Sequence, residues 1–280
     1  MKKLLFLFLL INISLQAQEY ALKENISYYN DSINESDIYI KERCVLDLYY
    51  PKDKKDFATI VWFHGGGLKA FQKEIPEYLK NKGFAVVGVN YRLSPRAKSP
   101  AYVEDAAAAI SWVFKNITKY GGNSSMIFVS GHSAGGYLAL MTGLDKRWLA
   151  ANGTDANSIA GLIPISGQTI THSTIREEQH ISPTIAVVDS MAPLNHIRPD
   201  APPLLLITGD RNLEMAGRYE ENALLAAMMK AVGHPTVLYE LQGYTHMVTE
   251  AAFPLLVKEV NRIIKEKQKM TVKTQVKGNE

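Results

Sequence analysis

The sequence predicts an α/β protein whose mostly parallel, doubly wound sheet carries helices on both faces. Short apolar runs typical of buried strands alternate along the chain with longer, helix-like segments. Two glycine-rich turns, at residues 64–67 and 131–135, each follow one of these apolar runs. Strands that alternate with helices favour a parallel sheet, in which functional residues gather at the carboxyl ends of the strands.

Six apolar runs predict the strands of this sheet, after an antiparallel start around residues 38–50. The runs are Ala58–Phe63, Phe84–Val89, Met126–Ser130, Ile159–Ile165, Pro203–Thr208 and Thr236–Leu241. The segments between and after them predict helices, which we expect at residues 69–81, 101–118, 134–144, 214–232 and 250–266. The connection from Gln168 to Arg198 is too short for a large lid, and we expect a small cap-like insertion there.

The N-terminal residues 1–17 resemble a secretory signal peptide. Lys2 and Lys3 precede an apolar run over residues 4–11, and small or polar residues follow as far as Ala17. This run is shorter than the roughly 20 apolar residues that span a membrane as a helix. We therefore expect cleavage near Ala17 and export as a secreted or periplasmic protein, without a stable membrane anchor.

The remaining chain is expected to form one globular domain over residues 18–266, followed by a basic, disordered tail over residues 267–280. Hydrophobic residues make up 46% of the 280 and charged residues 21%, which is ordinary for a globular protein. The net charge of +3 arises from the two N-terminal lysines and the tail, so no basic stripe indicates nucleic-acid binding. The single cysteine, Cys44, has no partner for an intramolecular disulfide.

The five residues Gly131-His132-Ser133-Ala134-Gly135 fit the G-x-S-x-G pattern of a nucleophile elbow. They stand between a strand-like run and a helix-like run, where such an elbow forms. The abrupt turn strains the backbone at the serine and brings chain segments close together, so the flanking positions must be small. Ser133 is therefore the candidate nucleophile, at a helix N-terminus whose dipole favours the negative charge of acyl transfer.

A second motif, His64-Gly65-Gly66-Gly67, follows the apolar run at residues 58–63 and is typical of the oxyanion hole of lipases and esterases. Consecutive glycines allow the dihedral angles that point backbone N–H groups at an oxyanion, and they leave space for a substrate. A glycine-rich turn without function is the alternative. The presence of both motifs in this order along the chain favours the oxyanion hole.

Three further segments complete a resemblance to a known group of proteins. They are Asn90-Tyr91-Arg92-Leu93-Ser94-Pro95, Asp105 in an alanine-rich helix, and Tyr120-Gly121-Gly122-Asn123. With the two motifs, they make residues 45–265 resemble α/β-hydrolases of the hormone-sensitive-lipase-like esterase group, near the bacterial feruloyl-esterase-like and kynurenine-formamidase-like branch. The resemblance implies an α/β-hydrolase fold for the catalytic domain. It also implies an oxyanion hole built from the backbone N–H groups of Gly66, Gly67 and Ala134.

The general base is expected to be His246. It follows the last predicted strand and a turn and precedes the last helix, where the chain order serine, acid, histidine places the base. In related esterases a glycine often follows this histidine, whereas Met247 stands here. His132 adjoins the nucleophile, and its side chain is expected to point elsewhere. The other histidines have less suitable places: His64 in the oxyanion segment, His234 in a turn, and His172, His180 and His196 in the long connection.

The acid that orients the base is expected in the loop after the strand-like run at residues 203–208. Many relatives carry it a few positions after the glycine, where this chain has Asn212, and an amide cannot stabilise an imidazolium by charge. Asp210 is the first choice and Glu214 the alternative, although either carboxylate could serve only the helix that follows. Asp189, in the long connection, is a distant third.

These residues predict a serine esterase that works through an acyl-enzyme on short-chain or aryl esters, with acetyl or feruloyl esters of carbohydrates as a further hypothesis. No zinc-binding or nucleotide-binding pattern is visible, and we expect no cofactor and no metal. The alternatives are an arylformamidase-like amide hydrolase and a non-catalytic binding protein of the same fold. The physiological ester and the oligomeric state cannot be derived from these motifs.

Overall fold

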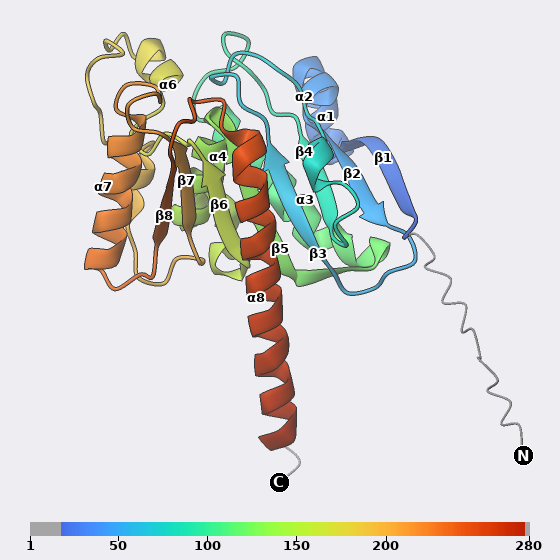
Figure 1. The fold of residues 1–280 in the computed structure, drawn as a ribbon. Helices are drawn as coiled ribbons and strands as arrows, with labels where there is room; N and C mark the ends of the chain where they lie inside the picture. The colour runs from blue at the N-terminus through green and yellow to red at the C-terminus, as the bar shows by residue number, and fades with distance from the viewer. Residues whose placement is uncertain (1–17, 278–280) are drawn as a thin grey trace, which may run out of the picture.

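The computed structural model describes residues 18–277, with side chains as far as residue 269. The expected signal peptide at residues 1–17 and the last residues 278–280 lie outside the described residues. An eight-stranded sheet crosses the molecule, with helices on both of its faces (Figure 1). The α/β class and the mostly parallel sheet that the sequence predicts are confirmed.

The strands follow the order β1-β2-β4-β3-β5-β6-β7-β8 across the sheet. The first two pair antiparallel with each other, and β2 is also antiparallel to β4, whereas the remaining pairs are parallel. The six strands predicted from apolar runs are all present, within four residues at each end. The bounds are β1 Tyr20–Ser27, β2 Val45–Pro51, β3 Phe57–Phe63, β4 Ala85–Val89, β5 Gly122–His132, β6 Gly161–Ile165, β7 Leu205–Gly209 and β8 Val237–Leu241.

Helices cover the sheet unequally. One face packs against α3, α4 and α7, and the other packs against α8. The apolar side chains of the strands therefore belong to two separate clusters, one on each face of the sheet. Figure 1 shows α8 crossing the near face. The helices are α1 Asp31–Ser36, α2 Ile38–Arg43, α3 Ala101–Asn116, α4 Ala134–Leu144, α5 Lys146–Ala150, α6 Ser173–Glu178, α7 Arg218–Ala231 and α8 Thr249–Lys277, with short 3-10 turns at Glu77–Leu79, Ile117–Tyr120, Ala156–Ser158 and Pro193–His196.

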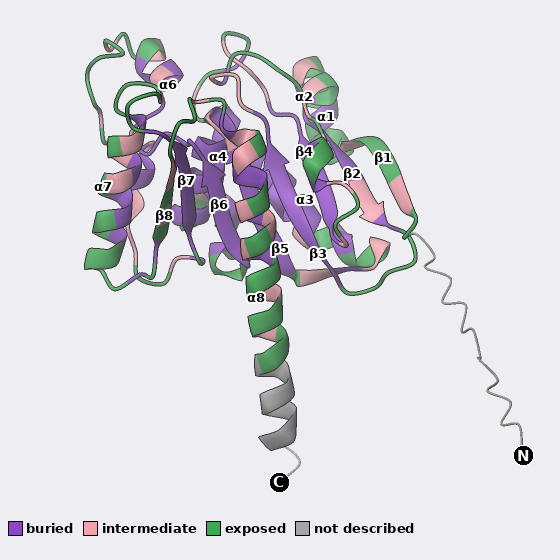
Figure 2. Cartoon of the chain, viewed as in Figure 1, coloured by how far each residue is buried: buried purple, intermediate pink, exposed green. Residues whose placement is uncertain are grey.

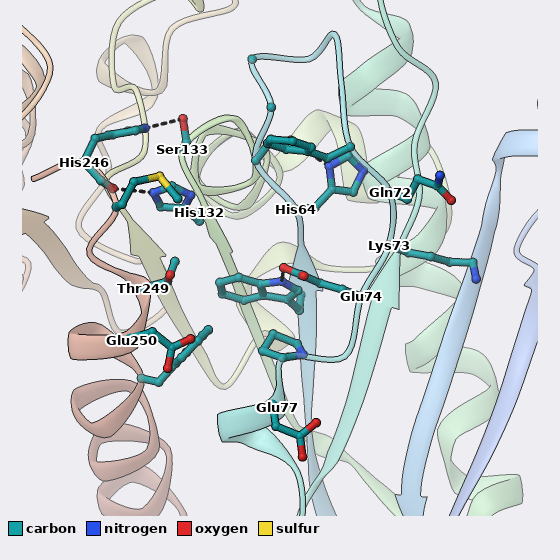
Figure 3. A pocket seen from close by; sticks show the side chains of 18 of the residues that line it. His64, Gln72, Lys73, Glu74, Glu77, His132, Ser133, His246, Thr249 and Glu250 are labelled. Atoms are coloured by element: carbon teal, nitrogen blue, oxygen red, sulfur yellow. Dashed lines mark hydrogen bonds between the residues drawn. The ribbon is translucent and has the colours of Figure 1, made fainter.

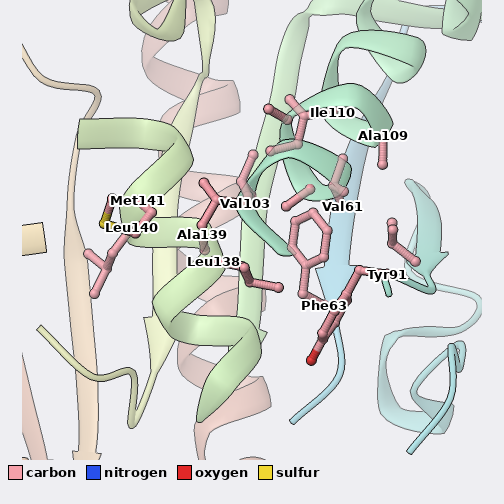
Figure 4. Packing of buried hydrophobic residues seen from close by; sticks show 14 of the residues in the cluster. Val61, Phe63, Tyr91, Val103, Ala109, Ile110, Leu138, Ala139, Leu140 and Met141 are labelled. Carbon is pink, nitrogen blue, oxygen red and sulfur yellow. The ribbon is translucent and has the colours of Figure 1, made fainter. Parts of the chain in front are cut away.

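The helix that follows the nucleophile is buried along its whole length. All eleven residues of α4 are buried, and the central strands beside it are buried on both faces (Figure 2). Val61 and Phe63 of β3 lie in the same cluster as Ile110 of α3 and Leu138 of α4 (Figure 4). A helix that is apolar all round belongs in the core of a protein. This packing fixes the position at which α4 begins, and with it the nucleophile.

The expected antiparallel start at residues 38–50 is only half right. Residues 45–51 form β2, but residues 38–43 form helix α2. The side chain of Asp37 caps this helix by accepting a hydrogen bond from the backbone N–H of Tyr39 at 2.8 Å. The first strand of the sheet is instead β1, an edge strand that starts at Tyr20.

The helix expected at residues 69–81 is wrong, since only Glu77–Leu79 forms a short 3-10 turn. The rest of the segment has no regular secondary structure and passes directly over β4, where a Cβ on Gly88 would lie 2.2 Å from the carbonyl oxygen of Glu74. The side chain of Asn90 also accepts a hydrogen bond from the backbone N–H of Lys73 at 2.6 Å. A helix at this place would lose both contacts. Its absence leaves room on this face between the segment and α8.

The last helix is longer than expected. The tail at residues 267–280, expected to be disordered, is helical as far as Lys277, and α8 extends beyond the sheet (Figure 1). No glycine or proline occurs between Pro254 and Lys277, and the lysines and glutamines of this stretch are good helix formers, so no residue ends the helix earlier. The helices of the described part of the chain include none that is long and apolar enough to cross a bilayer.

Candidate active site

Ser133 occupies a strained turn between β5 and α4. Its backbone has φ 55° and ψ −114°, an unfavourable region for a residue with a side chain. The neighbouring glycines make the turn possible, because a Cβ on Gly135 would lie 2.0 Å from the carbonyl oxygen of Phe63, and one on Gly131 would lie 2.5 Å from the Gly135 backbone. The backbone N–H of Ser133 donates to the Ile165 carbonyl at 2.9 Å, which ties the elbow to the adjacent strand. The sequence prediction of an elbow at this position agrees with the geometry.

His246 lies beside the nucleophile, on the loop between β8 and α8. Its Nε2 is 2.9 Å from Ser133 Oγ (Figure 3), and its Nδ1 is 2.8 Å from Glu214 Oε2. A carboxylate only accepts hydrogen bonds, so Nδ1 carries the proton and Nε2 is free to accept the proton of the serine hydroxyl. The structure thus brings Ser133 and His246 together as the sequence predicts.

The first choice for the acid, Asp210, is wrong, and the alternative Glu214 occupies the place beside His246. Asp210 accepts hydrogen bonds from the backbone N–H groups of Gly243 and Asn212, both at 2.9 Å, and these lower the pKa of its carboxyl. The chain turns tightly after Asp210, since the backbone N–H of Glu214 donates a hydrogen bond to the backbone carbonyl of Asp210 at 2.8 Å. That turn carries Glu214 back toward the histidine and leaves Asp210 to hold the loop.

Asp189, the third choice, is also engaged elsewhere. Its Oδ1 accepts hydrogen bonds from the hydroxyl of Thr171 and the backbone N–H of Met191, both at 2.7 Å. It therefore serves the fold of the connection between β6 and β7.

The carboxylate of Glu214 has a full set of hydrogen-bond donors. Oε2 accepts from His246 and from the backbone N–H of Met215 at 2.9 Å, and Oε1 accepts from the hydroxyl of Ser166 and the backbone N–H of Gly209 at 3.3 Å. Its side chain is 1% exposed. This burial raises the pKa of Glu214, but the hydrogen bonds from His246 and Ser166 outweigh it and lower the pKa to about 2. Glu214 is therefore ionised at neutral pH.

The glycine segment after β3 has the geometry expected of an oxyanion hole. Gly66 and Gly67 have φ of 97° and 64°, and the N–H groups of Lys69 and Ala70 both donate to the Gly66 carbonyl at 3.0 Å. Within residues 18–277, no acceptor of the protein binds the N–H groups of these two glycines. Ala134 is the first residue of α4, so its N–H also has no partner inside the helix. All three residues predicted for this role thus offer backbone donors near Ser133.

Arg43, a residue that the sequence did not single out, holds the oxyanion segment from behind. Its guanidinium lies 3.2 Å from His64 Nε2 and donates to the carbonyls of Phe71 at 2.6 Å and Tyr91 at 2.9 Å. His64 Nδ1 faces the Gly65 carbonyl at 2.8 Å, and the ring stacks on Tyr91. Burial lowers the pKa of His64 to about 4, so this histidine is a neutral structural residue.

His132 departs from expectation, since its side chain does not point away from the site. Its Nε2 lies 2.8 Å from the carbonyl oxygen of His246, and the two rings are 4.8 Å apart. Burial lowers the pKa of His132 to about 4, which leaves the ring neutral, with Nε2–H as the donor to this carbonyl. His132 therefore fixes the backbone of the base.

None of the remaining histidines approaches the triad geometry. His172 Nδ1 accepts from the backbone N–H of Thr174 at 3.2 Å, His196 Nε2 lies 2.9 Å from the Ser190 carbonyl, and His234 contacts Thr236 in its turn. His180 is exposed.

A cavity of about 790 Å³ opens beside Ser133, between the segment at residues 71–77 and the start of α8. Ser133, His132 and His246 lie at one end, and Glu74, Glu77 and Glu250 toward the other (Figure 3). Three large apolar side chains also line it and remain exposed: Phe71 by 69%, Met215 by 54% and Met247 by 74%. Among the described residues, the cavity included, no group of three His, Cys, Asp or Glu side chains is arranged to hold a metal ion.

The fold and this site define the chain as an α/β-hydrolase. The BD-FAE family model matches residues 46–216, more than half of the sequence. The chain therefore belongs to the BD-FAE family, within the hormone-sensitive-lipase-like α/β-hydrolases, as the resemblance of its motifs predicts.

Curated relatives include two esterases of Mycobacterium tuberculosis. Esterase LipC is 27% identical over 229 residues, which are 72% of this chain and 56% of the relative. Esterase LipQ is 29% identical over 187 residues, which are 61% of this chain and 44% of the relative. The chain thus spans about half the length of the curated relatives that it matches.

Solved structures share the fold at low sequence identity. A truncated carbohydrate esterase from gut microbiota superposes with a TM-score of 0.72 and 20% identity, over 88% of this chain and 97% of that one. Esterase B of Lactobacillus rhamnosis superposes with a TM-score of 0.71 and 17% identity, over 94% of this chain and 90% of that one.

Proposed function

We propose that this protein is a carboxylic-ester hydrolase that uses Ser133 as its nucleophile. One observation carries the proposal: Ser133 Oγ, His246 and Glu214 form a continuous hydrogen-bonded series, with separations of 2.9 and 2.8 Å. The series has the geometry that acyl transfer needs, with a nucleophile, a base on the nucleophile and an acid on the base. The matches to esterases LipC and LipQ also support this reaction.

The reaction has two steps. His246 Nε2 takes the proton of Ser133 as Oγ attacks the ester carbonyl, and Glu214 stabilises the imidazolium that forms. The N–H groups of Gly66, Gly67 and Ala134 bind the oxyanion, and His246 then donates its proton to the leaving alcohol. In the second step a water molecule, deprotonated by His246, hydrolyses the acyl-enzyme and frees the serine.

Short-chain or aryl esters are the proposed substrates. The exposed apolar side chains of Phe71, Met215 and Met247 line the cavity that has the triad at one end, and they offer contact to a small acyl or aromatic group. The carboxylates at the other end are hydrogen-bond acceptors suited to sugar hydroxyls. Together with the fold shared with a carbohydrate esterase, they support acetyl or feruloyl esters of carbohydrates as natural substrates. Export by residues 1–17 remains part of this proposal.

Two other functions are compatible with the fold. An arylformamidase-like amide hydrolase would use the same three side chains, but the proposed export of the protein fits poorly with intracellular metabolism. A non-catalytic binding protein is disfavoured because the nucleophile, base and acid stand within hydrogen-bond distance of one another. No specific contact in the site favours either alternative.

The test is hydrolysis of p-nitrophenyl acetate, butyrate and a longer acyl ester by the mature protein and by Ser133→Ala. We expect serine-dependent turnover that falls with acyl length, and release of acetate or ferulate from xylan. Turnover that persists in Ser133→Ala would overturn the assignment of the nucleophile. Turnover of the small esters without product from xylan would overturn the carbohydrate substrate alone.

A further inference from the structure

We propose that Ser166 is a positioning residue that orients the carboxylate of Glu214 toward His246. The inference rests on the proposed function, and it adds a fourth side chain to the predicted triad. Ser166 directly follows β6, the strand beside β7, and was not singled out by any sequence motif. Its hydroxyl donates to Glu214 Oε1, the carboxylate oxygen that does not face the histidine.

The backbone at Ser166 is held in a conformation that costs energy. Its φ is 48°, in the left-handed region, and the residue is fully buried. Its N–H donates to the Ile207 carbonyl of β7 at 2.7 Å, and its carbonyl accepts a hydrogen bond from the buried Arg218 of α7. Two contacts from two different elements therefore fix this turn, and they aim the side chain at the acid.

The remaining contacts of Glu214 show why a fourth donor matters. The acid sits on the irregular loop between β7 and α7, not on a strand or a helix. The last residue of β7, Gly209, and the loop residue Met215 supply backbone N–H groups that reach one oxygen each. Ser166 is the one side chain besides His246 that holds the carboxylate in the described structure, and it reaches the site from a neighbouring strand. Without it, Oε1 would keep only the long contact from Gly209, at 3.3 Å, and the carboxylate could turn away from the base.

Arg218 extends this support to α7. Its Nε also donates to Glu221 Oε1 at 2.9 Å, and Glu221 Oε2 accepts from the N–H groups of Thr169 at 2.8 Å and Ile170 at 3.1 Å. The strained turn at residue 166 is thus one end of a buried network that includes the first turn of α7. Buried polar groups that are all paired specify one arrangement of the side chains, which is what an acid on a loop requires.

The test compares Ser166→Ala with Ser166→Gly, because the two variants separate the hydroxyl from the backbone. Both remove the donor to Glu214, but alanine keeps the Cβ, and with it the strain that serine has at φ 48°, whereas glycine relieves that strain. We expect kcat per active site on p-nitrophenyl butyrate to fall roughly 10- to 100-fold in both, as expected for loss of a hydrogen bond to a charged group. We expect KM to change less than about twofold, because the acid does not touch the bound ester.

Ser130→Ala is the matched control. Ser130 is also fully buried, lies on β5 and donates its hydroxyl to the Ile163 carbonyl at 2.6 Å, away from the acid. We expect it to lower the melting temperature and to leave kcat unchanged. Active-site titration with an activated phosphate ester gives the concentration of competent sites, so that a variant that merely folds poorly loses sites but not kcat per site.

The outcomes distinguish this inference from the proposed function. If Ser166→Gly keeps the kcat of the unmodified protein while the Ser133→Ala variant is inactive, the positioning role is overturned and the proposed function stands. If the unmodified protein itself shows no serine-dependent turnover, the proposed function fails, and the inference with it. A fall in kcat in Ser166→Ala but not in Ser166→Gly would show that the hydrogen bond serves only to hold the strained backbone at residue 166, and would also overturn the proposal.

Discussion

Glu214 Oε2 lies 2.8 Å from His246 Nδ1, although the two residues are 32 positions apart and neither lies in a helix or strand. The contact joins the loop after β7 to the loop after β8. Parallel pairing of these strands, in register from Leu205 with Val237 to Gly209 with Leu241, brings the two loops to the same edge of the sheet. The sheet therefore assembles the acid and the base, and its register decides which carboxylate reaches the histidine.

The first prediction concerns the identity of the acid. We expect Glu214→Gln to lower kcat on p-nitrophenyl butyrate by roughly 10³- to 10⁴-fold, because an amide no longer stabilises the imidazolium by charge and favours the wrong tautomer of the histidine. Asp210→Asn is the matched variant, since it makes the same chemical change at a carboxylate of the same loop that does not contact the base. We expect it to keep kcat within about threefold and to lower the melting temperature, because Asp210 holds the turn at Gly243. The reverse pattern would restore Asp210 as the acid.

The second prediction concerns the oxyanion segment. A methyl group on Gly66 would collide with the Ala70 carbonyl, since its Cβ would lie 2.4 Å from that oxygen, and φ 97° is unfavourable for alanine. We expect Gly66→Ala to lower kcat by roughly 100- to 1000-fold, as loss of an oxyanion donor does. Gly153→Ala is the control, because Gly153 has φ 70° and open space around it, after α5. A comparable loss of kcat in both variants would contradict the assignment.

The third prediction concerns the apolar wall of the cavity. Phe71 is 69% exposed and its carbonyl is anchored to Arg43, so its ring stands at the site without being needed for the core. We expect Phe71→Ala to raise KM for an aryl or butyryl ester roughly two- to tenfold, with a smaller effect on acetate esters, because one apolar contact is lost. Leu224→Ala, which removes an exposed leucine from α7, should leave both values of KM unchanged. An equal change for acetate and butyrate would argue against a role for Phe71 in acyl selection.

The fourth prediction concerns stability against acid. Burial, reinforced by Arg218 and Arg176, lowers the pKa of His172 from 6.5 to about 3. Below pH 6.5 the unfolded chain therefore binds a proton that the folded chain does not, and the free energy of unfolding falls as the pH decreases from about 6.5 toward 3. In His172→Asn, the amide oxygen can still accept from the N–H of Thr174. We expect the variant to lose less stability between pH 6.5 and 5 in denaturant titrations, by up to about 1.4 kcal/mol per pH unit. Parallel curves for the two proteins would contradict this assignment.

Much of the fold follows from local patterns. The apolar runs of β3 to β7 and the apolar helix α4 are visible in the sequence, because each of these elements is buried along most of its length. The segment at residues 69–81 shows the limit of this reasoning. Its composition is compatible with a helix, but the approach to Gly88 and the hydrogen bond to Asn90 depend on a strand elsewhere in the chain. Long-range contacts of this kind override local propensity.

The site residues also divide into those that local motifs predict and those that depend on long-range contacts. Ser133, the oxyanion glycines and His246 occupy positions that their motifs and chain order specify. For the acid, the sequence favours Asp210 over Glu214 and the structure does not, because the choice depends on a turn within the loop and on the register of β7 with β8. Arg43 and Ser166 carry no motif at all. The sequence signal for Ser166 is its place directly after a predicted strand, Ile159–Ile165, at the same sheet edge as the other functional residues.

The most direct test of the central claim, that Ser133 is an activated nucleophile, is covalent labelling by diethyl p-nitrophenyl phosphate followed by mass spectrometry of the intact and the digested protein. We predict one diethylphosphoryl group per chain, on the peptide that contains Ser133, with no labelling of Ser133→Ala and much slower labelling of Glu214→Gln. A protein that hydrolyses esters but carries the label on another residue, or carries none, would contradict the account.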